Sequence, residues 1–347
     1  MNQRKKIRVL VIDDSALMRQ LLTALLEEDS DIEVVGAATD PYVAREKIKR
    51  LNPDVLTLDV EMPGMDGLTF LEKLMRLRPM PVVMVSSLTD RGTEATIRAL
   101  ELGAIDFVAK PRDNVREGMS TLAREICDKV HMAARAHVRM MRDAPAPIAD
   151  AAPASVGRER VVAIGASAGG TQAIAEILSA LPAHTPGVAI VQHMPPKFTA
   201  LFAAHLDARS QLEVREAKDG DLLRTGVALI APGGLHMAVI RNGKGYSVRV
   251  YEGAPVNLHQ PAVDVLFESV ARVAGGDSLG ILLTGMGNDG ARGLLAMKQS
   301  GAQTAAQDEA SSVIFGMPEQ AIRLGAAEDV VGLEKIARHI VTWASKS

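Results

Sequence analysis

The sequence predicts two α/β domains of the doubly wound type, each with a parallel β-sheet between layers of helices. The chain has 347 residues, which is long for one average domain and sufficient for two domains with cores of their own. Short apolar runs alternate with helical patterns, as in parallel sheets. Between Ala144 and Ala154, nine of eleven residues are Ala or Pro, which predicts an extended linker. We therefore expect one domain at 1–125, a helix extension and linker at 126–156, and a second domain at 157–347.

The first domain is expected to alternate strictly between strands and helices. The strands are predicted at residues 8–12, 33–37, 55–59, 82–86 and 106–109. The helices are predicted at about 16–28, 42–51, 68–77, 94–102 and 115–137. From Lys129 to Arg142 the chain is rich in Arg, Lys and His. Such a charge run is typical of a solvated helix face, which here leads into the linker.

Composition argues against several classes of protein. Hydrophobic residues make up 47% of the chain and charged residues 23%, which is ordinary for a globular protein. The net charge is -3, and residues 157–347 hold 17 Lys or Arg against 18 Asp or Glu, so neither nucleic-acid binding nor a DNA-binding second domain is favoured. Cys127 is the only cysteine, which argues against disulfides and fits a reducing cytoplasm. No apolar stretch approaches the ~18 residues that span a bilayer, so we expect a soluble, cytoplasmic protein without membrane insertion.

Charged residues follow the strands of the first domain at the points where they end. Asp13 and Asp14 follow the first strand, Asp59 closes the third, and Lys110 follows the fifth. Ligands bind at the carboxyl ends of parallel strands, and carboxylates that converge there favour Mg²⁺. With Mg²⁺ and Lys110 neutralising charge, Asp59 can attack phosphorus, and Ser86 at the end of the fourth strand can contact a phosphoryl oxygen. One such Asp often only caps a helix, but matched strand ends favour a phosphate-accepting site.

Residues 7 to about 125 resemble a response-regulator receiver domain. The resemblance rests on the motifs VIDDS, LTLDVEMPGMDG, VVMVSS and DFVAKP, which occur in the order of that family. It implies a flavodoxin-like fold and phosphorylation of Asp59 with Mg²⁺ as cofactor. The implied residues are the Mg²⁺ ligands Asp13, Asp14, Asp59 and the backbone carbonyl of Glu61, the phosphate contacts Ser86 and Lys110, and the switch residue Phe107. Ser87 offers a second hydroxyl, and the strand end favours Ser86.

The second domain opens with a strand at 160–165, a glycine-rich turn that contains Ser167, and a helix at about 171–181. Small residues on such a turn can present a serine beside backbone N–H groups and a helix N-terminus, as in a nucleophile elbow. A dinucleotide-binding loop is a competing interpretation, but Ser167 stands where that loop needs a glycine. The glycines are also compatible with mere close packing of helix on strand.

A histidine follows a neighbouring strand and is a candidate base for Ser167. His193 comes directly after the apolar strand at 188–191, and its imidazole can take the serine proton. His236 is the best alternative, because it follows the strand at 227–230. The remaining alternatives in this domain are His184, His205 and His259.

The third group comes from the segment after a buried-looking strand at 280–284. Asp289 lies in the turn that follows, before a helix from about Ala291, where it can orient the imidazole and stabilise its charged form. Neighbouring glycines leave backbone N–H groups, among them that of Met286, available for an oxyanion hole. An Asp in such a turn is often only a helix cap, so its weight comes from being the third group at a strand end.

Residues from about 160 to the C-terminus resemble the catalytic domain of the chemotaxis protein-glutamate methylesterase/glutaminase family. The motifs are IGASAGG, VQHMP, IAPGGLHM and LLTGMGNDGA, and the chain order Ser, His, Asp differs from that of the α/β-hydrolases. The resemblance implies a Rossmann-like domain with a small antiparallel element. It implies Ser167 as nucleophile, His193 as base and acid, Asp289 as orienting carboxylate, and backbone N–H groups of Met286 and Ala168 at the oxyanion. Many members have Thr where this chain has Ala168, which makes deamidation a weaker expectation than ester cleavage.

Together the two resemblances imply an enzyme for adaptation in chemosensory signalling that is activated by phosphorylation. The implied partners are a chemosensory histidine kinase, which donates phosphate, and methyl-accepting chemoreceptors, which are the substrates. The esterase reaction needs no cofactor. The unphosphorylated first domain is expected to cover the catalytic cleft, and phosphate on Asp59 is expected to draw Ser86 inward, reorient Phe107 and relieve the inhibition. The alternatives are a receiver with a DNA-binding output and a cofactor-binding oxidoreductase.

Overall fold

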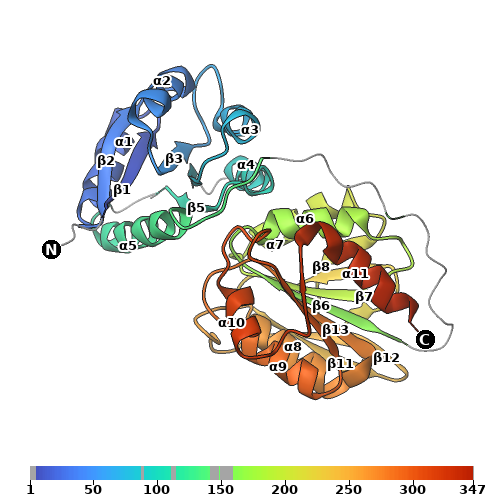
Figure 1. The fold of residues 1–347 in the computed structure, drawn as a ribbon. Coiled ribbons are helices and arrows are strands. Elements are labelled where there is room, and N and C mark those ends of the chain that lie inside the picture. Colours follow the sequence, from blue (N-terminus) through green and yellow to red (C-terminus); the bar gives the residue numbers. More distant parts are fainter. Residues whose placement is uncertain (1–4, 87–89, 111–114, 141–147, 149–158, 347) are drawn as a thin grey trace. The chain divides into compact units, whose positions relative to one another are not determined.

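A computed structural model describes residues 5–86, 90–110, 115–140, 148 and 159–346 of the chain. The chain divides into two compact units, Met1–Arg142 and Asp143–Ser347 (Figure 1). Within the predicted linker only Ile148 is described, and its N–H donates a hydrogen bond to the Ala180 carbonyl (3.0 Å). The rest of the linker prediction falls outside the described residues.

The first unit contains a five-stranded parallel sheet in the order β2-β1-β3-β4-β5. Its strands are β1 (Ile7–Ile12), β2 (Ile32–Ala38), β3 (Val55–Asp59), β4 (Val82–Ser86) and β5 (Asp106–Ala109). Its helices are α1 (Ala16–Glu27), α2 (Pro41–Leu51), α3 (Gly67–Leu77), α4 (Asp90–Glu101) and α5 (Val115–Ala133). The side chains of Ser15, Asp40 and Asp66 accept hydrogen bonds from first-turn N–H groups and so start the first three helices. The predicted alternation of strands and helices is confirmed.

The C-terminal part of α5 differs from its prediction. The helix ends at Ala133 and not near residue 137, and Lys129 does not belong to a solvated face. The Lys129 side chain is only 20% exposed, and its Nζ lies 2.8 Å from Glu125, 3.4 Å from Asp106 and 5.0 Å from the centre of the Phe107 ring. Burial lowers the pKa of Lys129, but the two carboxylates outweigh it and raise the pKa overall. Lys129 can lie in the interior because Asp106, at the start of β5, pairs with its ammonium group.

The second unit is built on a seven-stranded sheet, parallel throughout, in the order β15-β14-β13-β6-β7-β10-β8. Its strands are β6 (Val161–Ala166), β7 (Gly187–Gln192), β8 (Glu213–Glu216), β10 (Val227–Ile230), β13 (Ser278–Leu282), β14 (Gln303–Gln307) and β15 (Asp329–Val331). A small antiparallel sheet, β11-β12-β9, is formed by β9 (Leu222–Leu223), β11 (His236–Asn242) and β12 (Gly245–Tyr251). The predicted fold class is confirmed.

Helices lie on both faces of this parallel sheet (Figure 1). They are α6 (Gly170–Ala180), α7 (Phe198–Asp207), α8 (Val263–Val273), α9 (Ala291–Gln299), α10 (Met317–Arg323) and α11 (Leu333–Ser345), with a 3₁₀ turn, η1 (Gly275–Asp277). Because both faces are covered, the central strands β6 and β7 are buried at every residue and apolar except for Gln192 at the end of β7. None of the helices in the described part of the chain is long and apolar enough to cross a membrane.

The strand before Asp289 lies two residues earlier than predicted, at Ser278–Leu282. The next two residues still bond to the β6 end, because Leu283 donates to the Gly165 carbonyl (2.8 Å) and the Thr284 carbonyl accepts from the Ser167 N–H (3.0 Å).

Gly165, before the turn that contains Ser167, packs tightly, since a Cβ there would collide with the Val263 side chain. The glycines of this turn therefore do permit close helix–strand packing.

Candidate functional site

Two neighbouring strands bring Ser167 and His193 to the same edge of the sheet. Ala166 at the end of β6 pairs with Gln192 at the end of β7, and the His193 N–H donates to the Ala166 carbonyl (3.1 Å). The two predicted residues are therefore each the first after adjacent parallel strands. Their side chains start about one strand spacing apart, ~4.8 Å.

The backbone around Ser167 is held on both sides. Its N–H donates to the Thr284 carbonyl, and its own carbonyl accepts from the N–H of Gly170 (2.7 Å) and from Nε2 of Gln192 (2.9 Å). Gly285 lies against it so closely that a Cβ at that position would be 2.7 Å from the Ser167 Cβ. Only a glycine fits there. The turn is rigid, and the Ser167 side chain is partly exposed.

His193 forms a short hydrogen bond with Asp289. The distance from His193 Nε2 to Asp289 Oδ2 is 2.8 Å, and the His193 side chain is only 7% exposed. Nδ1, the other ring nitrogen, is buried and has no hydrogen-bond partner among the described residues, so the Ser167 hydroxyl does not bond to it in this conformation. Such bonds often tighten only when substrate binds.

Asp289 is ionised by the groups that surround it. Burial raises its pKa, but the bond to His193, the nearby His193 charge and bonds from Asn257 Nδ2 (2.8 Å) and the Val263 N–H (2.7 Å) lower it overall. A third neutral donor is the N–H of Asp264 (3.1 Å). Val263 and Asp264 open α8, whose positive N-terminal end favours an anion. Because Asp289 is a carboxylate, His193 Nε2 must carry the hydrogen of their bond.

His259 stacks on His193. Their ring centres are 3.6 Å apart and their planes differ by 12°. Burial first, and then the charge of His193, lower the pKa of His259 to about 4, so its ring is neutral at pH 7. Sequence reasoning treated His259 only as an alternative to His193. No local pattern marks it, because the contact joins two loops that are distant in the chain.

The other candidate histidines lie elsewhere. His236 is 2% exposed at the start of β11, and its Nε2 donates to the Ala254 carbonyl (3.0 Å). His205 lies in the last turn of α7, and His184 precedes β7 at the opposite end of the sheet. His193 is the histidine that reaches Asp289.

Two backbone N–H groups beside Ser167 remain available as donors. Those of Ala168 and Met286 make no hydrogen bond with another described residue, whereas the N–H of Ser167 itself is used by Thr284. The Ala168 N–H shares its peptide group with the Ser167 carbonyl, whose bonds from the Gly170 N–H and Gln192 Nε2 orient that peptide. The predicted oxyanion donors are therefore unpaired, although their roles stay predictions.

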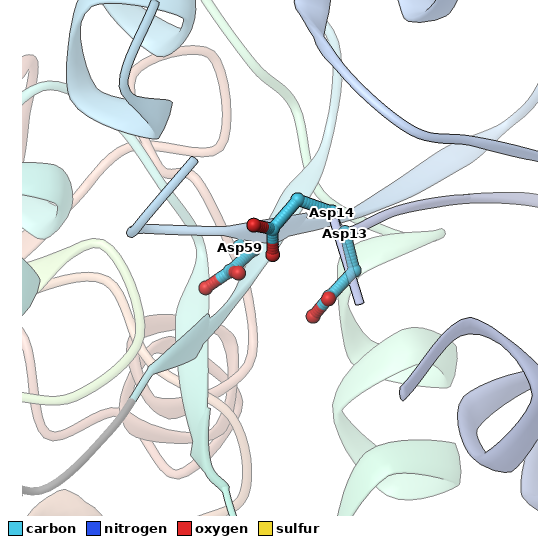
Figure 2. Close-up of side chains that lie close together, drawn as sticks. All are labelled: Asp13, Asp14 and Asp59. Atoms are coloured by element: carbon cyan, nitrogen blue, oxygen red, sulfur yellow. The ribbon is translucent and has the colours of Figure 1, made fainter. Parts of the chain in front are cut away.

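The first unit gathers three carboxylates at the carboxyl edge of its sheet (Figure 2). One oxygen from each of Asp13, Asp14 and Asp59 lies within 4.8 Å of the others. Asp13 and Asp59 are buried, and Asp14 is exposed. The donors are all oxygens, which suits Mg²⁺.

Lys110 is the cation of this cluster. Its Nζ lies 2.7 Å from Asp59 Oδ2 and 3.0 Å from Asp13 Oδ2. Burial raises the pKa of Asp59 to about 6, which the contact with Lys110 only partly offsets and the charge of Asp13 reinforces. One lysine does not neutralise three carboxylates, so the residues fit a divalent cation.

The remaining predicted residues surround this cluster. Ser86 is buried, and its hydroxyl donates to the Gly92 carbonyl (3.2 Å). The Glu61 side chain is exposed, while its N–H donates to Asp59 Oδ1 (3.2 Å). Phe107 is 7% exposed. Ser87, the alternative to Ser86, lies outside the described residues.

Comparisons with known proteins identify both domains of the chain. Residues 162–340 match the family model described as CheB methylesterase, and residues 9–118 match that of the response regulator receiver domain. The chain is 57% identical over 341 residues to protein-glutamate methylesterase/protein-glutamine glutaminase 2 of Pseudomonas aeruginosa, covering 98% of this chain and 97% of the relative. It is 56% identical over 340 residues to the protein-glutamate methylesterase/protein-glutamine glutaminase of Salmonella typhi, with the same coverage.

A solved structure matches the second unit. It is the crystal structure of the Thermotoga maritima CheB methylesterase catalytic domain, with 33% identity and a TM-score of 0.52, covering 54% of this chain and 99% of that one. The chain thus belongs to the CheB methylesterase family and carries a response regulator receiver domain.

Proposed function

We propose that this protein is a phosphorylation-activated serine hydrolase of chemosensory adaptation. It removes the methyl group from glutamate γ-methyl esters of chemoreceptors and deamidates particular receptor glutamines, as the names of its relatives suggest for those proteins. The observation that carries the proposal is the 2.8 Å bond between His193 and Asp289 at the strand end beside Ser167. We place the protein in the cytoplasm, where the receptor segments that it modifies would be accessible.

In the first half of the reaction Ser167 is acylated. Nδ1 of neutral His193 holds a free lone pair, because Nε2 carries the hydrogen that bonds Asp289, so Nδ1 takes the hydroxyl proton as the Ser167 oxygen attacks the ester carbonyl. The carbonyl π electrons move onto oxygen, and the N–H groups of Ala168 and Met286 stabilise that oxyanion. When the carbonyl re-forms, the bond to methoxide breaks, His193 returns the proton, and methanol leaves.

In the second half water replaces methanol. His193 takes a proton from water as the water oxygen attacks the acyl carbon, and it returns that proton to Ser167 when the acyl bond breaks. The receptor keeps a glutamate carboxylate. Asp289 stabilises the imidazolium that forms twice in each cycle. Deamidation follows the same steps with ammonia as the leaving group, which requires fuller protonation by His193.

The receiver domain supplies the regulatory input. Asp59 accepts a phosphoryl group from a chemosensory histidine kinase, and Ser86 and Lys110 bind its oxygens. Asp13, Asp14, Asp59 and the backbone carbonyl of Glu61 would hold Mg²⁺. When bound, Mg²⁺ neutralises charge on the incoming phosphoryl group. Burial of Asp59 and the excess of carboxylates support this assignment.

Phosphorylation is proposed to activate by release. Phe107 and Ser86 rearrange when Asp59 is phosphorylated, and the receiver domain then uncovers the Ser167 cleft. A fragment without residues 1–150 should accordingly hydrolyse ester faster than the unphosphorylated full chain. An equal or slower rate would contradict release from occlusion.

The decisive assay measures methanol from methylated receptor, with and without Mg²⁺ and a small-molecule phosphodonor. Wild type should release methanol, and the phosphodonor should raise the rate. Ser167→Ala should lose hydrolysis and still incorporate phosphate, whereas Asp59→Asn should lose the increase and still react with a serine-directed inhibitor. Retained esterase activity in Ser167→Ala would exclude the nucleophile assignment. Ammonia release from unmodified receptor tests the glutaminase activity in the same samples.

A further inference from the structure

The segment 256–259 forms a tight turn over the His193–Asp289 pair. Val256 and His259 pair as an antiparallel bridge, with N–H to carbonyl distances of 2.9 and 3.0 Å in the two directions. The two residues between them, Asn257 and Leu258, have φ angles of 52° and 70°. Two consecutive positive φ values define a type I′ turn, which Asn accepts readily and Leu does not.

The Leu258 side chain does not stabilise this strained turn. The Leu258 side chain is 95% exposed, so its packing within the described chain does not offset the backbone cost. The turn fixes the positions of Asn257 and His259, the residues on either side of Leu258. Asn257 Nδ2 donates to Asp289 Oδ1 and to Asp264 Oδ2, both at 2.8 Å, and His259 lies flat on His193. Strain that persists beside reactive groups points to a functional constraint.

We propose that His259 is a positioning residue for the hydrolysis. Its stacked ring fixes the plane of the His193 imidazole, so that Nε2 stays on Asp289 while Nδ1 remains free to exchange a proton with Ser167. This inference rests on the function proposed above and adds a fourth residue to it.

The stack has a second effect, on charge. His193 becomes an imidazolium during each cycle, and a neutral aromatic face stabilises a neighbouring cation. The lowered pKa of His259 supports this view, because a protonated His259 would repel that imidazolium instead. The other ionisable groups near the turn are Asp289, Asp264 and Arg292. Arg292 donates to the Asn257 side chain (3.2 Å) and lies 3.9 Å from Asp264.

The test compares three variants of the full-length, phosphorylated protein. His259→Ala removes the ring, His259→Phe keeps a ring without nitrogens, and His184→Ala changes a histidine at the opposite end of the sheet. We expect His259→Ala to lower kcat for methanol release about ten- to hundredfold with KM within about twofold, since misplacement of a reacting group by ~1 Å has such an effect. His259→Phe should recover most of kcat, and His184→Ala should resemble wild type.

Several outcomes would overturn the proposal. They are a His259→Ala variant with kcat within about twofold of wild type, an effect confined to KM, or a His259→Phe variant that is as slow as His259→Ala. Thermal unfolding of each variant separates misfolding from misplacement, and His259→Phe keeps the proposal testable if His259→Ala does not fold. Failure of the underlying function would look different, because wild type would then release no methanol or Ser167→Ala would still release it.

Discussion

Asp59, at the end of β3, and Asp289, in the loop between β13 and α9, are both buried carboxylates, yet their pKa values move in opposite directions. Burial raises the pKa of Asp59 to about 6, Asp13 adds a like charge, and the contact with Lys110 offsets these effects only in part. Burial acts on Asp289 too, but His193, Asn257 and the start of α8 lower its pKa overall. The bond and charge of His193, together with the N–H donors around Asp289, therefore outweigh burial there, whereas Lys110 does not outweigh it at Asp59.

The difference in pKa distinguishes a carboxylate whose partners are all in the protein from one that still needs a ligand. Asp289 is ionised without any ligand, because protein N–H groups donate hydrogen bonds to it. Asp59 lies where a negative charge is unfavourable until a bound cation offsets it. A carboxylate that orients a catalytic base needs the first environment, and one that accepts and releases phosphate needs the second.

The largest expected effect comes from removing the charge of Asp289. Asp289→Asn retains the shape but cannot stabilise the His193 imidazolium, so kcat for methanol release should fall about 10³–10⁴-fold. Single-turnover methanol release measures the loss. Asp329→Asn, on the exposed edge strand β15, is the matched control and should leave the rate within twofold. If kcat of Asp289→Asn fell less than tenfold, the charge of Asp289 would not matter for catalysis, and the contrast drawn between Asp289 and Asp59 would fail.

The second effect concerns stability and pH at Asp59. Its pKa is higher in the folded state than the ordinary value of 3.8 for an aspartate, so the folded protein binds more protons and loses stability as pH rises from about 4 to about 6. The loss is about 3 kcal/mol at most. Asp59→Asn should abolish this pH-dependent loss. In Mg²⁺-free buffer, the free energy of unfolding of the variant should therefore rise relative to that of wild type as pH increases from about 4 to about 6. Denaturant unfolding at several pH values measures the gain. A difference that does not depend on pH would contradict the raised pKa.

The third effect is stabilisation by Mg²⁺. If the three carboxylates bind the ion, saturating Mg²⁺ at about 100 times its Kd should stabilise the folded protein by about 2.7 kcal/mol. Thermal unfolding with and without Mg²⁺ at pH 7 measures this. Asp13→Asn should lose most of the gain, whereas Asp289→Asn should keep it. An equal shift in both variants would place the ion elsewhere.

The smallest effect is expected at Asn257, which donates to Asp289 and Asp264 together. Asn257→Ala should lower the free energy of unfolding by about 2 kcal/mol, within the range usual for a lost hydrogen bond to a charged group. It should also slow methanol release a few-fold. Asn242→Ala, on an exposed residue at the end of β11, provides the comparison. Equal stability of the two variants would show that the remaining donors suffice for Asp289.

The sequence was most informative where chemistry depends on local order. Each apolar strand of a parallel sheet ends where a loop begins, so position alone predicted that Asp13, Ser167 and His193 directly follow strands and that Asp59 ends one. Asp289 lies farther along its loop, seven residues after the end of β13. The periodicity placed the starts of α1, α2 and α3 within one residue, whereas α4 begins at Asp90, four residues before its predicted start.

Features that depend on contacts between distant segments were not predictable. Lys129 was assigned to a solvated face, since nothing near it in the chain reveals that Asp106 lies across from it. His259 and Asn257 gave no signal, because their partners are reached only when the 256–259 turn folds over β7. The end of β13 was predicted two residues too late because Leu283 and Thr284 continue the run of buried residues and still bond to the end of β6.

The pairing of Ala166 with Gln192 has a consequence for how this enzyme can vary. Side chains alternate between the two faces of a sheet, so one residue inserted within β7 would turn His193 away from Ser167 and end catalysis. An insertion at the opposite end of the sheet, near His184, changes only the length of a surface connection. Length variation among functional variants should therefore concentrate at the amino ends of the strands, and the carboxyl ends should keep a constant residue count.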